Sequence, residues 1–298
     1  MPNKDTFSSF HPLVSFAYFA LVLFFSMFFM HPAFLVISLA GALCYNVYLG
    51  GRKAVRFSLV YMLPLMLLTM IINPVFNHEG VTILAYLPSG NPLTLESIAY
   101  GMASAVMLVA VILWFSCFNK VITSDKFVYL FGRIIPALSL VLSMTLRFVP
   151  RFKAQLGIVS EAQRCVGRDV SGGGIIRRAR NGVTILSIMI TWALENAIET
   201  ADSMKSRGYG LPGRSAFSIY RFDRRDGAAM LGLFACAGYI VAGWALGATY
   251  WRWFPSMKGG AIGVYPVTVL LVYIALCAMP VVLDKKEDRK WTRLPSAV

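Results

Sequence analysis

Charged side chains are scarce in this chain. Asp, Glu, Lys and Arg make up 14% of its 298 residues, whereas a soluble domain usually carries about 25%. Hydrophobic residues make up 57%, and the mean hydropathy is +0.65. This composition excludes an ordinary soluble domain. Because long apolar runs cross a bilayer as helices, we expect an all-α polytopic membrane protein.

Sequence motifs that would support chemistry are also missing. The chain has no Gly-x-x-x-x-Gly-Lys-[Ser/Thr] phosphate-binding loop, no His-Glu-x-x-His zinc motif and no Gly-x-Ser-x-Gly nucleophile motif. Its histidines lie far apart and its cysteines occur singly, without metal-ligand spacing; they are His11, His31, His78, Cys44, Cys117, Cys165, Cys236 and Cys277. We therefore expect no catalytic residue, no cofactor and no metal site.

Acidic residues are absent from the middle of the apolar segments, and inverted repeats are not visible. Buried acids usually mark a proton or ion path through a membrane protein, and inverted repeats are typical of many secondary transporters. Both absences disfavour a transporter that works alone.

Four apolar segments are long enough to cross about 30 Å of hydrocarbon as single helices: residues 57–76, 97–118, 227–250 and 261–283. A further segment, 13–49, is too long for one span, and His31-Pro32 lies near its middle. Because proline disfavours helix in the preceding residue, we expect two short spans joined by a tight turn. The sequence thus predicts about six spans, the third kinked at Pro64.

The distribution of Lys and Arg predicts the orientation of these spans. Loop 77–96 contains Glu79 and Glu96 but no basic residue, which favours the outside. Region 119–226 holds 17 of the 28 basic and 8 of the 14 acidic residues, which favours the cytoplasm. We expect both termini in the cytoplasm and three parts: a membrane segment 1–118 with four spans, a cytoplasmic coupling module 119–226, and a membrane segment 227–298 with two spans and a basic tail.

The 119–226 region contains two apolar runs, 134–146 and 183–194, that are short for spans. Two more spans here would leave the orientation of the others unchanged. They would, however, place charges such as Arg147 and Glu195 near hydrocarbon, at a cost of about 3 kcal/mol for each central charge. We favour helices that lie along the inner membrane surface.

Each of these helical regions ends at a glycine. The first is expected from about Pro150 through Gln163 to Gly167, and the second from Val183 to Ser206 or Arg207, followed by Gly208. Glycine is the usual left-handed residue after a helix, so Arg207 could be an ordinary basic residue at a cap. Alternatively, an arginine at a helix tip can form bidentate hydrogen bonds with a carboxylate of a partner protein.

The nearby arginine cluster has a simpler interpretation. Contact with anionic lipid headgroups is the expected role of Arg177, Arg178 and Arg180. Nucleic acid is not an expected partner, because no recognisable reading element accompanies the charge.

Several spaced motifs over residues 10–283 carry a family resemblance. They are Asn77-His-Glu-Gly80, Glu96-Ser-Ile-Ala-Tyr-Gly101, Asp125-Lys-Phe-Val-Tyr-Leu-Phe-Gly-Arg133 with Pro136, Arg147-Phe-Val-Pro-Arg-Phe152 and Ser206-Arg207-Gly208. The chain resembles the transmembrane T component of energy-coupling factor (ECF) transporters, which take up vitamins and metal ions in bacteria and archaea. That family has two Ala-Arg-Gly motifs in coupling helices. The second corresponds to Ser206-Arg207-Gly208 and the first to Cys165-Val166-Gly167, where the arginine is missing.

The resemblance implies a function and a set of partners. Two ABC-type ATPase subunits would bind the ATP and dock on the helix tips at Ser206, Arg207, Gly208, Cys165, Val166 and Gly167. A separate small membrane protein, the S component, would bind the substrate, in the cell membrane of a bacterium or archaeon. Arg164 and Arg168 flank the gap as candidates to replace the missing arginine, and we favour Arg168, beyond the glycine. The inequality of the tips favours two different ATPases.

Other function classes remain as alternatives. A membrane-embedded enzyme acting on lipids, with the basic region holding headgroups, is the main one, although no nucleophile or metal set supports it. The sequence does not tell which substrate is transported.

The orientation predicts a labelling pattern. In a background without the native cysteines, Arg180→Cys should react with a membrane-impermeant maleimide only in inside-out vesicles, because the module is expected in the cytoplasm. Ser89→Cys should react only from outside. Labelling of Arg180→Cys in intact cells would overturn the orientation.

Overall fold

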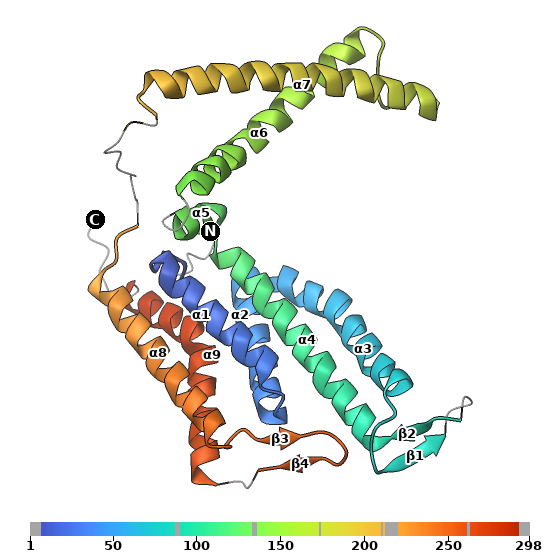
Figure 1. The fold of residues 1–298 in the computed structure, drawn as a ribbon, viewed down its shortest axis with the longest axis vertical. Helices are drawn as coiled ribbons and strands as arrows, with labels where there is room; N and C mark the ends of the chain where they lie inside the picture. Colours follow the sequence, from blue (N-terminus) through green and yellow to red (C-terminus); the bar gives the residue numbers. More distant parts are fainter. Residues whose placement is uncertain are drawn as a thin grey trace. The chain divides into compact units, whose positions relative to one another are not determined.

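The protein forms two compact helical units, described here from a computed structural model. The structure describes residues 7–86, 90–132, 136–172, 174–209, 211, 220–260 and 263–291. Ser89 and parts of the predicted 134–146 and 261–283 segments lie outside this range. The first unit comprises Met1–Lys126 with Tyr220–Val298, and the second comprises Phe127–Ile219. Figure 1 traces both units along the chain.

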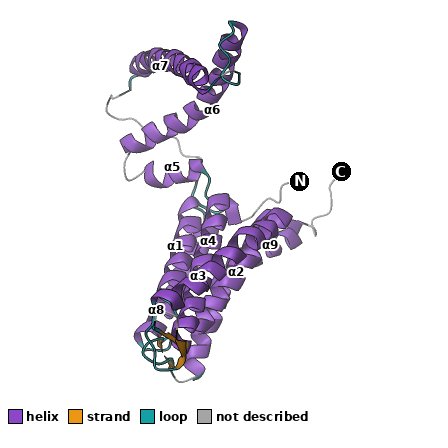
Figure 2. Ribbon diagram, turned by 90° about the vertical axis from the view of Figure 1, so that its right-hand side faces the viewer, coloured by secondary structure: helices purple, strands orange, loops and turns teal. Residues whose placement is uncertain are grey.

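The first unit is a bundle of long apolar helices. They are α1 (Pro12–Phe28), α2 (Pro32–Phe57), α3 (Leu63–Phe76), α4 (Leu95–Val121), α8 (Arg224–Ala245) and α9 (Val264–Trp291), preceded by a short 3₁₀ turn, η1 (Phe7–Ser9). Two hairpins, β1 (Ile83–Tyr86) with β2 (Pro92–Thr94) and β3 (Trp251–Arg252) with β4 (Lys258–Gly259), complete it. Figure 1 and Figure 2 show both hairpins at the same end of the bundle.

Two His-Pro pairs begin the first two helices. Pro12 and Pro32 occupy the first turn, where a missing N–H costs nothing. The preceding histidines cap the helices: Nδ1 of His11 accepts from the Leu13 N–H at 3.2 Å, and Nδ1 of His31 accepts from the Ala33 N–H at 3.2 Å. The predicted break at His31-Pro32 is therefore present.

The helical stretch Pro32–Phe76 combines α2, a π-helical turn η2 (Ser58–Met62) and α3. Its 45 residues would extend about 68 Å as one straight helix, twice the hydrocarbon thickness. Gly51, with φ 54° and ψ −139°, interrupts the helix. The chain distorts again just before Pro64, where the Leu63 N–H donates to the Ser58 carbonyl five residues back. Such a turn accommodates a proline that cannot donate.

By length and composition, four helical segments of the described chain could cross a membrane: Pro32–Phe76, Leu95–Val121, Arg224–Ala245 and Val264–Lys285. The helix Pro12–Phe28 is apolar but shorter. All of them lie in the first unit. The protein is an all-α polytopic membrane protein, and the number of passes stays a prediction.

Buried hydrogen bonds organise the bundle core. The indole of Trp114 on α4 is fully buried and donates to the Ser38 hydroxyl on α2 at 3.0 Å. Ser38 also lies 2.6 Å from the hydroxyl of Ser26 on α1. Because hydrocarbon offers no hydrogen-bond partner, these groups must satisfy one another. They fix the register of α1, α2 and α4.

A buried carboxylate organises the β1–β2 hairpin. Glu96, at the start of α4, is 3% exposed and accepts from the Thr82 hydroxyl at 2.9 Å and from the Thr82 N–H at 3.2 Å. The Thr94 hydroxyl donates to the Glu79 carbonyl at 2.7 Å. The sequence indicated Glu79 and Glu96 only as acidic loop residues, and the structure adds this internal role.

The second unit consists of α5 (Ser124–Gly132, which begins in the first unit), α6 (Pro136–Cys165) and α7 (Ile175–Ser206). The apolar run 134–146 and the helix expected from Pro150 are parts of one helix, α6, with Pro150 inside it. The second helix begins at Ile175 rather than Val183. The start of α7 was placed too late, because polar and basic residues with good helix propensity precede its apolar part. In α6, the apolar run and the charged stretch after it form one helix that continues through Pro150.

The two long helices pack antiparallel through a small apolar cluster. Val159 on α6 is buried with Ile185 and Met189 on α7. The ring of Phe152 meets the ring of Trp192 edge-on at 5.2 Å, and the guanidinium of Arg151 lies 5.7 Å from the Trp192 centroid. These contacts make α6 and α7 one body.

Close packing of α3 on α4 depends on Gly101. A Cβ at this position would lie 2.9 Å from the Met70 carbonyl oxygen and 3.1 Å from the Asn73 Cβ. Both belong to α3, and backbone cannot yield as a flexible side chain would.

We expect Gly101→Ala to lower the free energy of unfolding by about 1–3 kcal/mol, because overpacking displaces α3. The matched control is Gly232→Ala on α8, where a Cβ meets open space and the change should be neutral or stabilising by up to about 1 kcal/mol. Thermal unfolding in detergent measures both. Equal stability of the two variants would contradict the close approach.

Candidate functional site

The helices α6 and α7 end with the same hydrogen-bond pattern. At the end of α6, the Gly167 N–H donates to the Arg164 carbonyl at 3.0 Å, and the Arg168 N–H donates to the Gln163 carbonyl at 2.9 Å. At the end of α7, the Gly208 N–H donates to the Lys205 carbonyl at 3.0 Å, and the Tyr209 N–H donates to the Met204 carbonyl at 3.0 Å. Gly167 and Gly208 both have φ 78°. Each end is a Schellman cap.

This geometry fixes which residues of the two tips correspond. Val166 and Arg207 each directly precede the left-handed glycine, and Cys165 and Ser206 precede them. The side chain at the arginine position is therefore valine in the first tip. Both are solvent-accessible: Val166 is 70% exposed, and Arg207 is exposed.

The two arginines beside Val166 differ in environment. Arg164 lies on α6, and its Nε is 3.6 Å from an Asp169 carboxylate oxygen. Arg168 follows Gly167 and is therefore outside the helix, with its backbone completing the cap. Its side chain is exposed. Arg168 corresponds to Tyr209 of the second tip, so it does not occupy the position of Arg207.

The loop after α6 is held by the first turns of α7. The Asn181 amide donates to the Asp169 carbonyl at 2.9 Å, the Arg178 Nε donates to the Val170 carbonyl at 2.8 Å, and an Arg177 nitrogen lies 3.5 Å from the Gly167 carbonyl. Two of the three arginines interpreted as lipid contacts thus bind the chain itself. Sequence analysis missed this role.

Asp169 adds hydrogen bonds within the same loop. Its carboxylate accepts from the Ser171 hydroxyl at 2.6 Å and from the Ser171 N–H at 2.9 Å. These hydrogen bonds, from the hydroxyl first, hold the pKa of the Asp169 carboxyl below its usual range. The Asp-x-Ser spacing is a known turn signal, and it could have revealed this feature.

The tips lie at opposite ends of α7. The first is bound to its opening turns, and the second is its carboxyl end (Figure 1). Since α7 has 32 residues, its length places the tips about 45 Å apart. One small partner site cannot hold both.

Arg207 has a side chain available to a partner. Within the part of the chain that the structure describes, no carboxylate lies within ion-pair distance of its guanidinium. Tyr209, two residues on, is 47% exposed. Residues 210 and 212–219, which follow this tip, lie outside the described residues.

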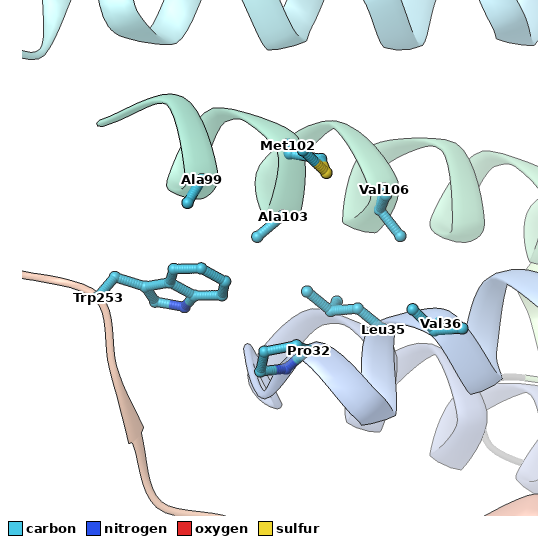
Figure 3. Close-up of a pocket in the computed structure, with 8 residues that line it drawn as sticks. All are labelled: Pro32, Leu35, Val36, Ala99, Met102, Ala103, Val106 and Trp253. Atoms are coloured by element: carbon cyan, nitrogen blue, oxygen red, sulfur yellow. The ribbon is translucent and has the colours of Figure 1, made fainter. Parts of the chain in front are cut away.

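The first unit contains an apolar pocket between α2, α4 and Trp253 (Figure 3). Its lining has no titratable or nucleophilic side chain and consists of Pro32, Leu35, Val36, Ala99, Met102, Ala103, Val106 and Trp253. Among the described residues, no cluster of three or more His, Cys, Asp and Glu side chains could hold a metal ion. The pocket offers shape and apolar surface, and no catalytic group.

Comparison with known proteins assigns the family. The profile of the CbiQ family, described as "Cobalt transport protein", matches residues 8–218. This range contains both helix tips and most of the bundle.

Curated relatives carry the name energy-coupling factor transporter transmembrane protein EcfT. The protein of Lactobacillus helveticus is 37% identical over 90 residues, 30% of this chain and 32% of the relative. That of Lacticaseibacillus paracasei is 34% identical over 105 residues, 35% of this chain and 40% of the relative. That of Acidaminococcus fermentans is 30% identical over 162 residues, 50% of this chain and 60% of the relative. The alignments thus span about a third to three fifths of these relatives.

These findings confirm the resemblance to the T component of ECF transporters and the prediction that the chain is not an enzyme. They leave the alternative of a lipid-modifying enzyme without support. With a bundle of apolar helices, two glycine-capped tips and a profile match over most of its length, the chain belongs to the CbiQ cobalt transport protein family.

Proposed function

We propose that this protein is the transmembrane coupling component of an ATP-driven ECF-type uptake transporter. Two ABC-type ATPases bind ATP and dock on the tips of α6 and α7. A separate small membrane protein binds the substrate. The observation that carries this proposal is the pair of identically capped, exposed helix ends, about 45 Å apart on one unit.

The orientation follows from the charge distribution. Residues 119–226 form the cytoplasmic coupling module, and both termini lie in the cytoplasm, with about six passes between them. The exposed apolar surface of the bundle contacts membrane lipids of the bacterial or archaeal cell membrane. Nucleic acid has no role in this function.

The packing of α6 on α7 suits a coupler. Closure of the ATPases moves the two tips, and the contacts among Phe152, Trp192 and Met189 make the helices respond as one body. The chain supplies no group for ATP hydrolysis, so the free energy comes from the partners.

Unequal tips favour two different ATPases. Arg207 offers a charged, bidentate donor, whereas the corresponding Val166 offers an apolar surface. At the first tip, the exposed Arg168 lies two residues on, beyond the glycine, and is the candidate for a weaker charged contact. A heterodimeric ATPase pair accommodates this difference, one groove carrying a carboxylate and the other an apolar patch. The cargo is a vitamin or a metal ion; the family description names cobalt.

Arg207→Glu should abolish docking of one ATPase. A charge-assisted hydrogen bond is worth about 1.5–3 kcal/mol, which corresponds to about 10- to 150-fold in affinity, and the reversed charge adds repulsion. The affinity-tagged chain is purified from host membranes in mild detergent, and co-purifying ATPases are quantified by mass spectrometry.

Lys153→Glu is the matched control, because it makes the same charge change at an exposed position in the middle of α6, about 20 Å along the helix from the first tip. It should retain both ATPases. Equal retention by Arg207→Glu and the wild type would refute docking through Arg207, and absence of any ATPase from the wild-type purification would refute the proposed function.

Val166→Arg tests the asymmetry of the tips. If the first groove is adapted to an apolar side chain, a buried arginine without a partner should weaken assembly at that tip. Titration of each purified ATPase against the variant measures this. Tighter binding, together with a single ATPase species at both tips, would show that the tips are not specialised.

A further inference from the structure

The chain leaves the first unit after Lys126 and returns to it at Tyr220. Residues flanking both points contact the same short stretch, residues 7–11, here called the anchor segment. It contains the 3₁₀ turn Phe7–Ser9 and two buried aromatic side chains, Phe7 and Phe10. All of these contacts lie within the first unit.

On the departure side, a buried lysine binds the anchor segment. Lys126 is 5% exposed, and its ammonium donates to the Ser8 carbonyl at 2.7 Å, to the Ser8 hydroxyl at 2.9 Å and to the Val121 carbonyl at 2.8 Å. An ammonium has three donors, and a buried charge requires such compensation. Lys126 therefore joins the end of α4 to the anchor segment.

On the return side, the first turn of α8 binds the same segment. Asp226 is 4% exposed; one carboxylate oxygen accepts from the His11 N–H and the other from the Asp223 N–H, both at 3.1 Å. Arg225 donates to the Ser9 hydroxyl at 3.1 Å, and its guanidinium lies 4.2 Å from the Phe10 ring centroid. The His11 ring also packs against Phe222 at 5.2 Å.

The anchor segment is in turn fixed to the bundle. The Phe7 N–H donates at 2.8 Å to Asp284 on α9. The Phe7 ring is fully buried and lies 5.1 Å from the ring of Tyr18 on α1. The segment thus connects α1, α4, α8 and α9 at the points where the chain enters and leaves the unit.

We propose that the anchor segment is a clasp through which movement of the coupling module reaches the membrane helices, with Lys126 and Arg225 as positioning residues. The clasp rests on the proposed function, because it transmits the movement that the ATPases start. A three-residue 3₁₀ turn has few hydrogen bonds of its own, so its position depends on the side chains around it, those of the two connections together with Asp284 and Tyr18 of the bundle. A shift in either connection therefore changes the hydrogen bonds of the other.

Hydrogen exchange with mass spectrometry tests the clasp on the purified complex with its ATPases, in ADP and in ATP with vanadate. The variants are Arg225→Ala and Lys126→Met. Because Arg225 is exposed, its variant should fold even if Lys126→Met does not. Arg224→Ala, the neighbouring exposed arginine, is the matched control, and Arg225→Lys, which keeps a donor and a cation, should rescue.

We expect exchange of the Phe7 and His11 amides to rise at least tenfold in Arg225→Ala and Lys126→Met. The nucleotide-dependent difference in exchange should persist in α6 and α7 but fall at least threefold in α1, α8 and α9. Arg224→Ala and Arg225→Lys should match the wild type. If Arg225 and Lys126 only stabilised the fold, their variants would exchange faster in both nucleotide states, and the nucleotide-dependent difference in exchange in α1, α8 and α9 would remain.

Two results would overturn the clasp. The first is unchanged exchange at Phe7 and His11 in Arg225→Ala. The second is faster exchange in the anchor segment while the nucleotide-dependent difference in exchange in α8 and α9 stays as in the wild type. A wild-type complex whose α6 and α7 do not respond to nucleotide would instead count against the proposed function. The two failures are therefore distinguishable.

Discussion

A helix end leaves polar backbone groups without partners, and this constraint governs the structure from the bundle to the tips. At the amino ends of α1 and α2, a histidine ring accepts an N–H and a proline removes another. At the carboxyl end of α4, the Lys126 ammonium binds the Val121 carbonyl. At the ends of α6 and α7, a left-handed glycine turns the chain back to donate to the last carbonyls. In each case, the group that satisfies the backbone at a helix end determines which residue is found there.

The glycine caps therefore have two consequences at once. They close the helices, and they hold the preceding residue outward, where a partner can reach it. Cap geometry depends on the glycine and not on its neighbour. Valine and arginine can therefore occupy the same position without changing the backbone, and the chemistry of a tip can vary while its shape is kept.

Much of the fold could be predicted from the apolar runs, from the His-Pro pairs that begin helices and from the glycines that follow helix ends. The break at His31-Pro32 and the ends of α6 and α7 depend on local sequence, and local sequence revealed them. The start of α7 did not follow from its apolar run, because basic and polar residues are good helix formers in water. The distortion before Pro64 is a π-helical turn rather than a simple kink, a distinction that residue type alone does not make.

In the candidate site, too, some features could be predicted from local sequence and others could not. Its residues were predicted from a repeated ending that is visible in the sequence, and the cap geometry gave their correspondence. The bracing of the loop by Arg177, Arg178 and Asn181 was missed, since it joins α7 to loop residues 8 to 12 positions earlier through backbone carbonyls, which carry no sequence signal. For the same reason, the link between Lys126 and Ser8, 118 positions apart, could not be foreseen.

The uninterrupted length of α7 has a mechanical consequence. The helix contains no proline, whereas α6 has Pro150 in its interior, so α7 is the stiffer of the two. Its packing against α6 reaches Trp192, which leaves a free arm of about 22 Å to Arg207. A rotation of about 10° at Trp192 would displace Arg207 by about 4 Å over that arm. A stiff helix of this length would thus convert a small rotation of the packed α6–α7 pair into a larger displacement at its tip.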